Sequence, residues 1–177
     1  MTAQRMRRLA PILEVLQVSR TRFIAMAESV PEKLWRKSPN TDTWSPAEVV
    51  AHVTMVEQFI IARSQTVLQV SPKHLPLRKR VHLPLLLVAW RVRKRKSPIP
   101  MDPSLIADRP ETLDRLATAR EGTLAFIEST RGQDLSAYRL PHPFLGSLNI
   151  YDWFRTIAYH DLRHAKQIRE VVETIHH

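Results

Sequence analysis

Four long segments of the sequence have apolar residues at every third or fourth position, and this period limits the possible folds more than any other feature. The four segments are about 5–27, 46–70, 109–131 and 150–175. Because this is the period of an α-helix with one buried face, we expect four amphipathic helices. They predict an all-α fold, a four-helix bundle of the up-and-down type that forms a single domain over residues 1–177.

The starts of the last three helices are marked by residues that cap helices. Ser45 is followed by Pro46 and by Glu48, which together have the pattern of a capping box. Asp108 and Asn149 stand in the corresponding places before the third and fourth segments. Gly132 occupies a position typical of a helix C-cap. These signals predict where each helix begins and where the third one ends.

Glycine and cysteine usage excludes several kinds of site. The three glycines, at positions 122, 132 and 146, cannot form a glycine-rich phosphate loop. Cysteine is absent, which excludes disulfides, thiolate zinc sites and a cysteine nucleophile. The chain also lacks a signal-peptide pattern and any apolar run near the roughly 20 residues of a membrane helix. We therefore expect a soluble, cytoplasmic protein.

Two histidines interrupt the apolar face of the fourth segment. His160 and His164 are four residues apart, so they project from one face of the helix about one turn from each other. Neutral imidazoles in this arrangement can bind one metal ion. His52, on the apolar face of the second segment, is the best candidate for a third ligand. The alternative is that each histidine is a core residue held by an ordinary hydrogen bond.

The stretches TWSPAEVVAHVTMVEQ and PHPFLGSLNIYDWFRTIAYHDLRHAKQI carry a family resemblance. They resemble the two signature regions of the DinB/YfiT-like superfamily of four-helix bundles. The matching features are the tryptophan and capping box from Trp44 to Glu48, then His52, then the pair His160 and His164. The resemblance extends over nearly the whole chain.

This resemblance implies a divalent ion, with zinc or nickel the first candidates, held by His52, His160 and His164 and keeping open coordination positions. It also implies a metal-dependent transferase or hydrolase that acts on a small-molecule substrate, with a low-molecular-weight thiol as a potential co-substrate. The alternative is a non-enzymatic bundle that carries a metal, or an interaction protein at a membrane surface. The sequence leaves a homodimer open and names no general acid or base.

Three further residues are candidates for the surroundings of the metal site or its pocket. Gln167 follows His164 by three residues and can either reach the site from the same helix or face solvent. Glu48 precedes His52 by one turn, although its place in the capping box is the favoured role. His142 lies in the Pro-His-Pro loop and can line the mouth of the site, although an ordinary loop histidine is the favoured interpretation. Glu57, five residues after His52, is expected to point away from it.

A basic, proline-rich insert, about residues 71–103, separates the second and third helices. It carries nine of the 27 basic residues and, from Ser71 to Met101, no acidic one. Without these nine, 18 basic residues stand against 17 acidic ones, so the insert accounts for almost the whole net charge of +10. The nine residues are Lys73, Arg78, Lys79, Arg80, Arg91, Arg93, Lys94, Arg95 and Lys96.

The insert has three interpretations because an apolar run, Leu83 to Trp90, lies between its two basic clusters. The leucines can pack on the bundle while the basic residues are solvated. Alternatively, residues 73–96 can lie on an anionic membrane surface, with the protein peripheral to the membrane. Nucleic acid is the least favoured partner, because such proteins seldom place a leucine-rich run among their phosphate-binding residues.

Overall fold

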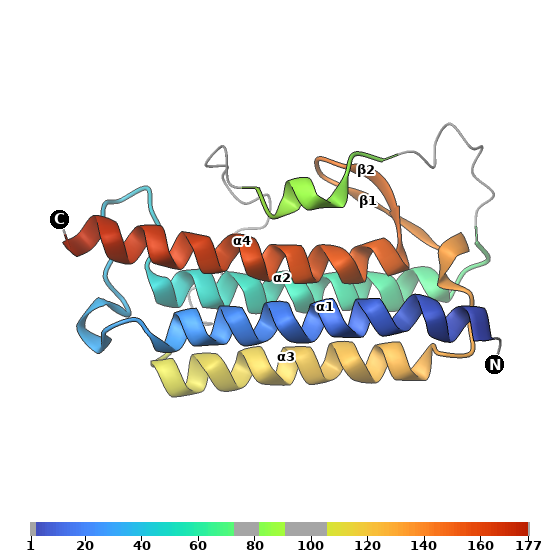
Figure 1. The fold of residues 1–177 in the computed structure, drawn as a ribbon, viewed down its shortest axis with the longest axis horizontal. Coiled ribbons are helices and arrows are strands. Elements are labelled where there is room, and N and C mark those ends of the chain that lie inside the picture. The colour runs from blue at the N-terminus through green and yellow to red at the C-terminus, as the bar shows by residue number, and fades with distance from the viewer. Residues whose placement is uncertain (1–2, 73–81, 91–105, 177) are drawn as a thin grey trace.

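The computed structural model describes residues 3–72, 82–90 and 106–176 and confirms the four-helix bundle. The helices are α1 (Ala3–Glu28), α2 (Pro46–Leu68), α3 (Arg109–Ser129) and α4 (Ile150–His176), and they lie side by side (Figure 1). Short 3-10 turns, η1 (Glu32–Leu34), η3 (Leu85–Val88) and η5 (Leu135–Ala137), lie in the connections. No helix among the described residues is both long and apolar enough to cross a membrane.

The helix starts are those that the capping residues predict. At α2 both halves of the capping box form: Ser45 Oγ accepts from the Glu48 N–H at 3.4 Å, and Glu48 Oε2 accepts from the Ser45 N–H at 2.7 Å. Asp108 caps α3, and Asn149 Oδ1 accepts from the backbone N–H of Asp152 in α4. The prediction for Gly132 is wrong, since α3 already ends at Ser129 with Thr130 as its C-cap.

The helix directions correct the expected up-and-down arrangement. Val53 and Leu116 belong to one apolar cluster, and Ile60 and Phe126 belong to another, so α2 and α3 run parallel. α1 and α4 run in the opposite direction (Figure 1). Because α2 has 23 residues and is about 35 Å long, two consecutive helices can be parallel only if a long connection returns the chain along the bundle. The insert supplies that connection.

A small β-hairpin, which the sequence interpretation treated as a loop, precedes α4. β1 (Arg139–His142) pairs antiparallel with β2 (Gly146–Asn149), and Gly146 adopts a φ of 96°, which a residue with a side chain rarely takes. The indole N–H of Trp153 donates to the backbone oxygen of Leu140, which attaches the hairpin to the start of α4. The hairpin therefore has a fixed position over one side of the bundle.

The apolar run of the insert, Leu83 to Trp90, lies within the described residues and contains η3, which lies against α4. Leu85 and Val88 pack on the first apolar cluster, as the packed-crossover interpretation expects. The Arg163 guanidinium of α4 donates to the backbone oxygen of Trp90, and the Leu83 N–H donates to the oxygen of Leu145 at 3.1 Å. All nine basic residues of the insert lie outside the described residues.

The core consists of two apolar clusters with a charged layer between them. The first cluster includes Leu16, Ile60 and Phe154, and the second includes Phe23 and Ile168. Between them lie four buried charged residues, one from each helix, which we call the ion layer: Arg20 of α1, Glu57 of α2, Arg120 of α3 and Asp161 of α4.

Ion pairs connect all four members of the ion layer. Arg120 Nε lies 2.7 Å from Glu57 Oε1, and its Nη2 lies 3.0 Å from Asp161 Oδ2. Arg20 also pairs with Glu57, and its Nε lies 3.2 Å from Asp161 Oδ2. The Thr123 hydroxyl donates to Glu57 Oε1 at 2.7 Å. Two guanidinium groups therefore balance two carboxylates inside the bundle.

We predict that Glu57→Gln destabilises the fold strongly, because it leaves two buried arginines with a single carboxylate. Loss of one partner of a buried ion pair lowers the free energy of unfolding by about 3–5 kcal/mol. Urea unfolding at neutral pH measures the change. Glu121→Gln on the exposed face of α3 is the matched control, with an expected change of about 0.5 kcal/mol or less. Equal effects of the two substitutions would contradict the importance of the ion layer.

Candidate metal centre

The structure brings His52, His160 and His164 together, as the sequence predicts. α2 positions His52, and α4, which packs against α2, positions the other two one turn apart. The ring centre of His52 lies 5.2 Å from the ring centre of His160 and 5.0 Å from that of His164. One ring nitrogen from each histidine can be chosen so that all three lie within 4.8 Å of one another. That the cluster binds a metal stays a prediction.

Burial keeps the three imidazoles neutral. It lowers the pKa of His52 to about 4. The pKa of His164 is lowered well below its usual value by burial and then by His160 and His52, and that of His160 is lowered by burial and then by His52. Neutral imidazole is the form that offers a lone pair to a metal ion. At neutral pH the cluster therefore requires no proton loss before it can bind one.

Hydrogen bonds orient the rings as metal ligands require. His164 Nδ1 lies 2.8 Å from Gln167 Oε1, so Nδ1–H donates and Nε2 keeps its lone pair. That Nε2 lies 3.1 Å from His160 Nε2. Two ligand nitrogens on one tetrahedral zinc ion stand about 3.3 Å apart, from Zn–N bonds of about 2.05 Å. In the structure His160 Nε2–H donates a hydrogen bond to His164 Nε2, and this spacing is close to the one that a shared ion would require.

His52 supplies a second indication that the cluster fits a cation. Its Nδ1 is buried and lacks a hydrogen-bond partner among the described residues. The ring packs against Trp44, with their ring centres 4.7 Å apart, which restricts its rotation. A buried polar atom without a partner costs free energy, and a metal ion bound at this nitrogen would remove that cost. The three residues therefore fit a divalent ion.

Of the three candidates for the surroundings, Gln167 lies at the site, as described above. His142 is near it: its Nδ1 accepts the backbone N–H groups of Phe144 and Leu145 at 3.1 and 3.2 Å, and its proximity contributes to the lowered pKa of His160. The carboxylate of Glu48 belongs to the helix cap, where Oε2 accepts from the backbone N–H and the hydroxyl of Ser45, each at 2.7 Å.

The sequence interpretation missed the ion layer beside the histidines. Asp161 is the neighbour of His160 in the chain, and burial raises its pKa to about 6 despite contact with Arg20 and Arg120. Arg20 in turn contributes to the lowered pKa of His160. Each ion-layer residue is a charged residue within the apolar face of its helix, which indicates burial, but the sequence pattern does not show that the four residues meet.

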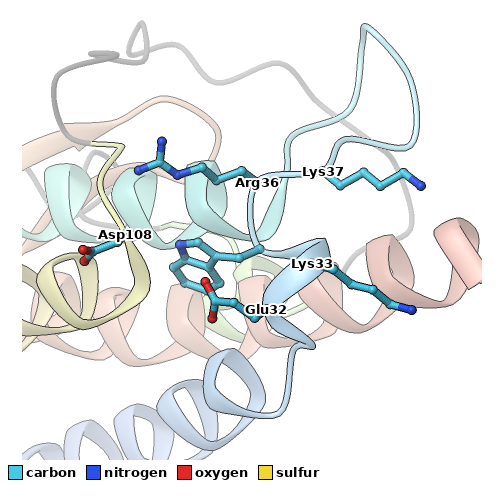
Figure 2. A pocket seen from close by; sticks show the side chains of 6 residues that line it. Glu32, Lys33, Arg36, Lys37 and Asp108 are labelled. Atoms are coloured by element: carbon cyan, nitrogen blue, oxygen red, sulfur yellow. The ribbon is translucent and has the colours of Figure 1, made fainter.

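A surface depression lies away from the histidines, near the connection between α1 and α2. Its volume is about 490 Å³. Figure 2 shows that Lys33 and Lys37 point away from Asp108. The lining residues are Glu32, Lys33, Trp35, Arg36, Lys37 and Asp108, so the depression has charges of both signs and no histidine. None of these lining residues belongs to the histidine cluster.

Comparisons with known proteins agree with the fold. A family model described as the DinB superfamily matches residues 16–168. The uncharacterized protein YuaE of Bacillus subtilis (strain 168) is 30% identical over 145 residues, which cover 81% of this chain and 86% of YuaE. The crystal structure of TT2238, a four-helix bundle protein, superimposes with a TM-score of 0.58 at 21% identity, covering 90% of this chain and 97% of TT2238.

We predict that the protein binds close to one divalent ion per chain and that His160→Ala abolishes this binding. The substitution removes one of three ligands, and the remaining two cannot hold the ion tightly. Elemental mass spectrometry on protein purified without a nickel column measures the content. The chain should end at Ile175, because His176 and His177 can bind metal independently. His82→Ala, outside the cluster, should keep the ion. Absence of an ion after loading with zinc, nickel or manganese would contradict the site.

We also predict that the metal-free protein loses stability as the pH falls from about 6.5 toward 4. In this interval an unfolded chain protonates at His52, whereas the folded chain, with a pKa of about 4, does not. The contribution of His52 is about 2 kcal/mol between about pH 7 and pH 5. Urea unfolding after chelation should therefore show a smaller decline for His52→Gln than for the wild type.

Two comparisons make the pH experiment specific to His52. Because the pKa of Asp161 is raised to about 6, this residue contributes more to the stability of the folded protein as the pH falls. Its contribution is opposite in sign to that of His52 and is the same in the variant and the wild type. Gln58→Ala, an exposed substitution on α2 that changes no titrating group, should decline with pH as the wild type does. An identical slope for His52→Gln would show that His52 is not held neutral by burial.

Proposed function

The chain belongs to the DinB superfamily, whose members generally bind a metal, and we propose that it is a metal-dependent transferase or hydrolase acting on a small molecule. His52, His160 and His164 would hold one divalent ion. Imidazole donors suit zinc and nickel, which are the ions that we propose. We propose a low-molecular-weight thiol as its co-substrate.

The observation that carries the proposal is the number of protein ligands. Within the part of the chain that the structure describes, the cluster comprises three histidines and no fourth histidine, aspartate or glutamate. Structural zinc sites usually have four protein ligands, whereas catalytic sites usually have three and leave one position for water or substrate. An open position therefore supports a catalytic role over a structural one.

The exposure of the cluster indicates the side from which a substrate would approach. His52 and His164 are buried, but His160 is partly exposed. A substrate would therefore reach the ion past His160, on the side where His142 and the hairpin lie near the site.

A bound ion would lower the pKa of water or of a thiol enough to give an anionic nucleophile near neutral pH. The residues of the chain prepare that position. Gln167 keeps His164 in the tautomer whose Nε2 is a ligand, and Trp44 restricts the ring of His52. Because the sequence has no cysteine, a reacting thiol would have to be a co-substrate.

We predict a metal-dependent reaction between small thiols, or water, and model electrophiles such as activated esters. Protein loaded with zinc or nickel should give a higher reaction rate than the same concentration of free metal. The rate should be lower by about 100-fold or more with His160→Ala, because this substitution removes the ion. His82→Ala should retain it. One ion per chain without acceleration, across several thiols and esters, would instead indicate a bundle that carries a metal without catalysing a reaction.

A further inference from the structure

η3 and the residues beside it have apolar side chains on both faces. Leu85 and Val88 face inward, where they pack on the first apolar cluster. The side chains on the opposite face are also apolar, and they are between 38% and 55% exposed. This outward face, which we call the η3 apolar face, consists of Leu83, Leu86, Leu87 and Trp90. A solvated crossover would place polar residues there.

The β-hairpin extends this surface. Phe144, in the turn between β1 and β2, is 48% exposed. The Leu83 N–H donates to the oxygen of Leu145, so the turn and the start of the η3 apolar face are joined directly. Figure 1 shows both elements on the same side of the bundle, beyond α4. An apolar patch built from two segments far apart in sequence is more than a scattered surface leucine.

The bundle holds the patch in place. The Arg163 guanidinium of α4 donates to the backbone oxygen of Trp90, and the inward side chains anchor the rest of η3. At the other end, His82 Nε2 lies 3.3 Å from the carboxylate of Asp152. The exposed side chains are therefore presented on a fixed support and need no folding step before they meet a partner.

The charge of the flanking sequence identifies the kind of partner. The nine basic residues of the insert stand on both sides of η3 in the chain, and no acidic residue occurs from Ser71 to Met101. In the sequence, Arg91 follows Trp90 directly, and Arg80 precedes Leu83 by three residues. The partner should therefore be both apolar and anionic.

We infer that the η3 apolar face and Phe144 dock on a bilayer that contains anionic lipids. The apolar side chains enter the headgroup boundary, with Trp90 at the interface, while basic residues meet the anionic headgroups. A second copy of the chain fits less well, because it would bring two strongly basic inserts together. Nucleic acid fits less well because five aliphatic and aromatic side chains would be left without apolar contacts. The inference is independent of the proposed chemistry.

Vesicle co-sedimentation tests the inference with the full chain. Vesicles of phosphatidylcholine mixed with phosphatidylserine should bind the protein at low salt, and pure phosphatidylcholine vesicles should bind it weakly. Binding should fall at about 0.5 M salt because the Debye length shortens. Leu86→Gln with Trp90→Gln should weaken binding by about tenfold or more, since two interfacial apolar side chains are lost. Phe59→Gln, an equally exposed apolar residue on α2, is the matched control.

Fluorescence locates the surface that enters the lipid. Brominated lipids should quench the wild-type protein more strongly than Trp90→Phe, which keeps an apolar side chain but removes that one indole. Equal quenching would place Trp90 away from the bilayer and overturn the inference. The inference would also be overturned if the double variant, Leu86→Gln with Trp90→Gln, binds vesicles as the wild type does or changes only self-association, measured by light scattering. Absence of binding to anionic vesicles at low salt would overturn it as well.

Discussion

Four ion pairs inside the bundle constrain the positions of all the helices. Arg20, Glu57, Arg120 and Asp161 come from four different helices, and each arginine contacts both carboxylates. Burying any one of these charges alone would be strongly unfavourable, so the layer is tolerable only when the four residues stand at one level of the bundle. Apolar packing permits helices to slide by a turn with little change in chemistry, whereas the ion layer does not. We interpret the layer as the feature that fixes helix register.

The register that the ion layer fixes is also the register that assembles the histidines. Asp161 faces the two arginines, and its neighbours His160 and His164 face α2 from the same two turns of α4. The ion pairs of Glu57 fix the position of α2 along the bundle. His52 lies about one and a half turns before Glu57 in α2, and this position places it opposite His160 and His164. The ion layer and the histidine cluster therefore share one stretch of α4, and a change in the ion layer should alter the geometry of the histidine cluster.

Residue patterns predicted the parts of the protein that depend on local geometry. Capping by Ser45, Asp108 and Asn149 is decided by hydrogen bonds within one turn, so the helix starts agree with prediction. The i, i+4 spacing of His160 and His164 follows from helical period alone. The hairpin was missed because its strands are only four residues long, and the assignment of Gly132 as a cap was wrong because α3 ends earlier. Short elements are governed by contacts outside their own sequence.

The sequence by itself determined four amphipathic helices, three histidines on apolar faces and a separate concentration of positive charge, because these are properties of residue type and spacing. Only the tertiary structure decided that α2 and α3 are parallel, that Glu57 belongs to a charged layer, and that η3 leaves an apolar face uncovered. Periodicity shows which residues share a face of a helix, but it does not show which neighbour that face meets. Partner choice depends on the packing of several helices at once, and that information is not contained in any single segment.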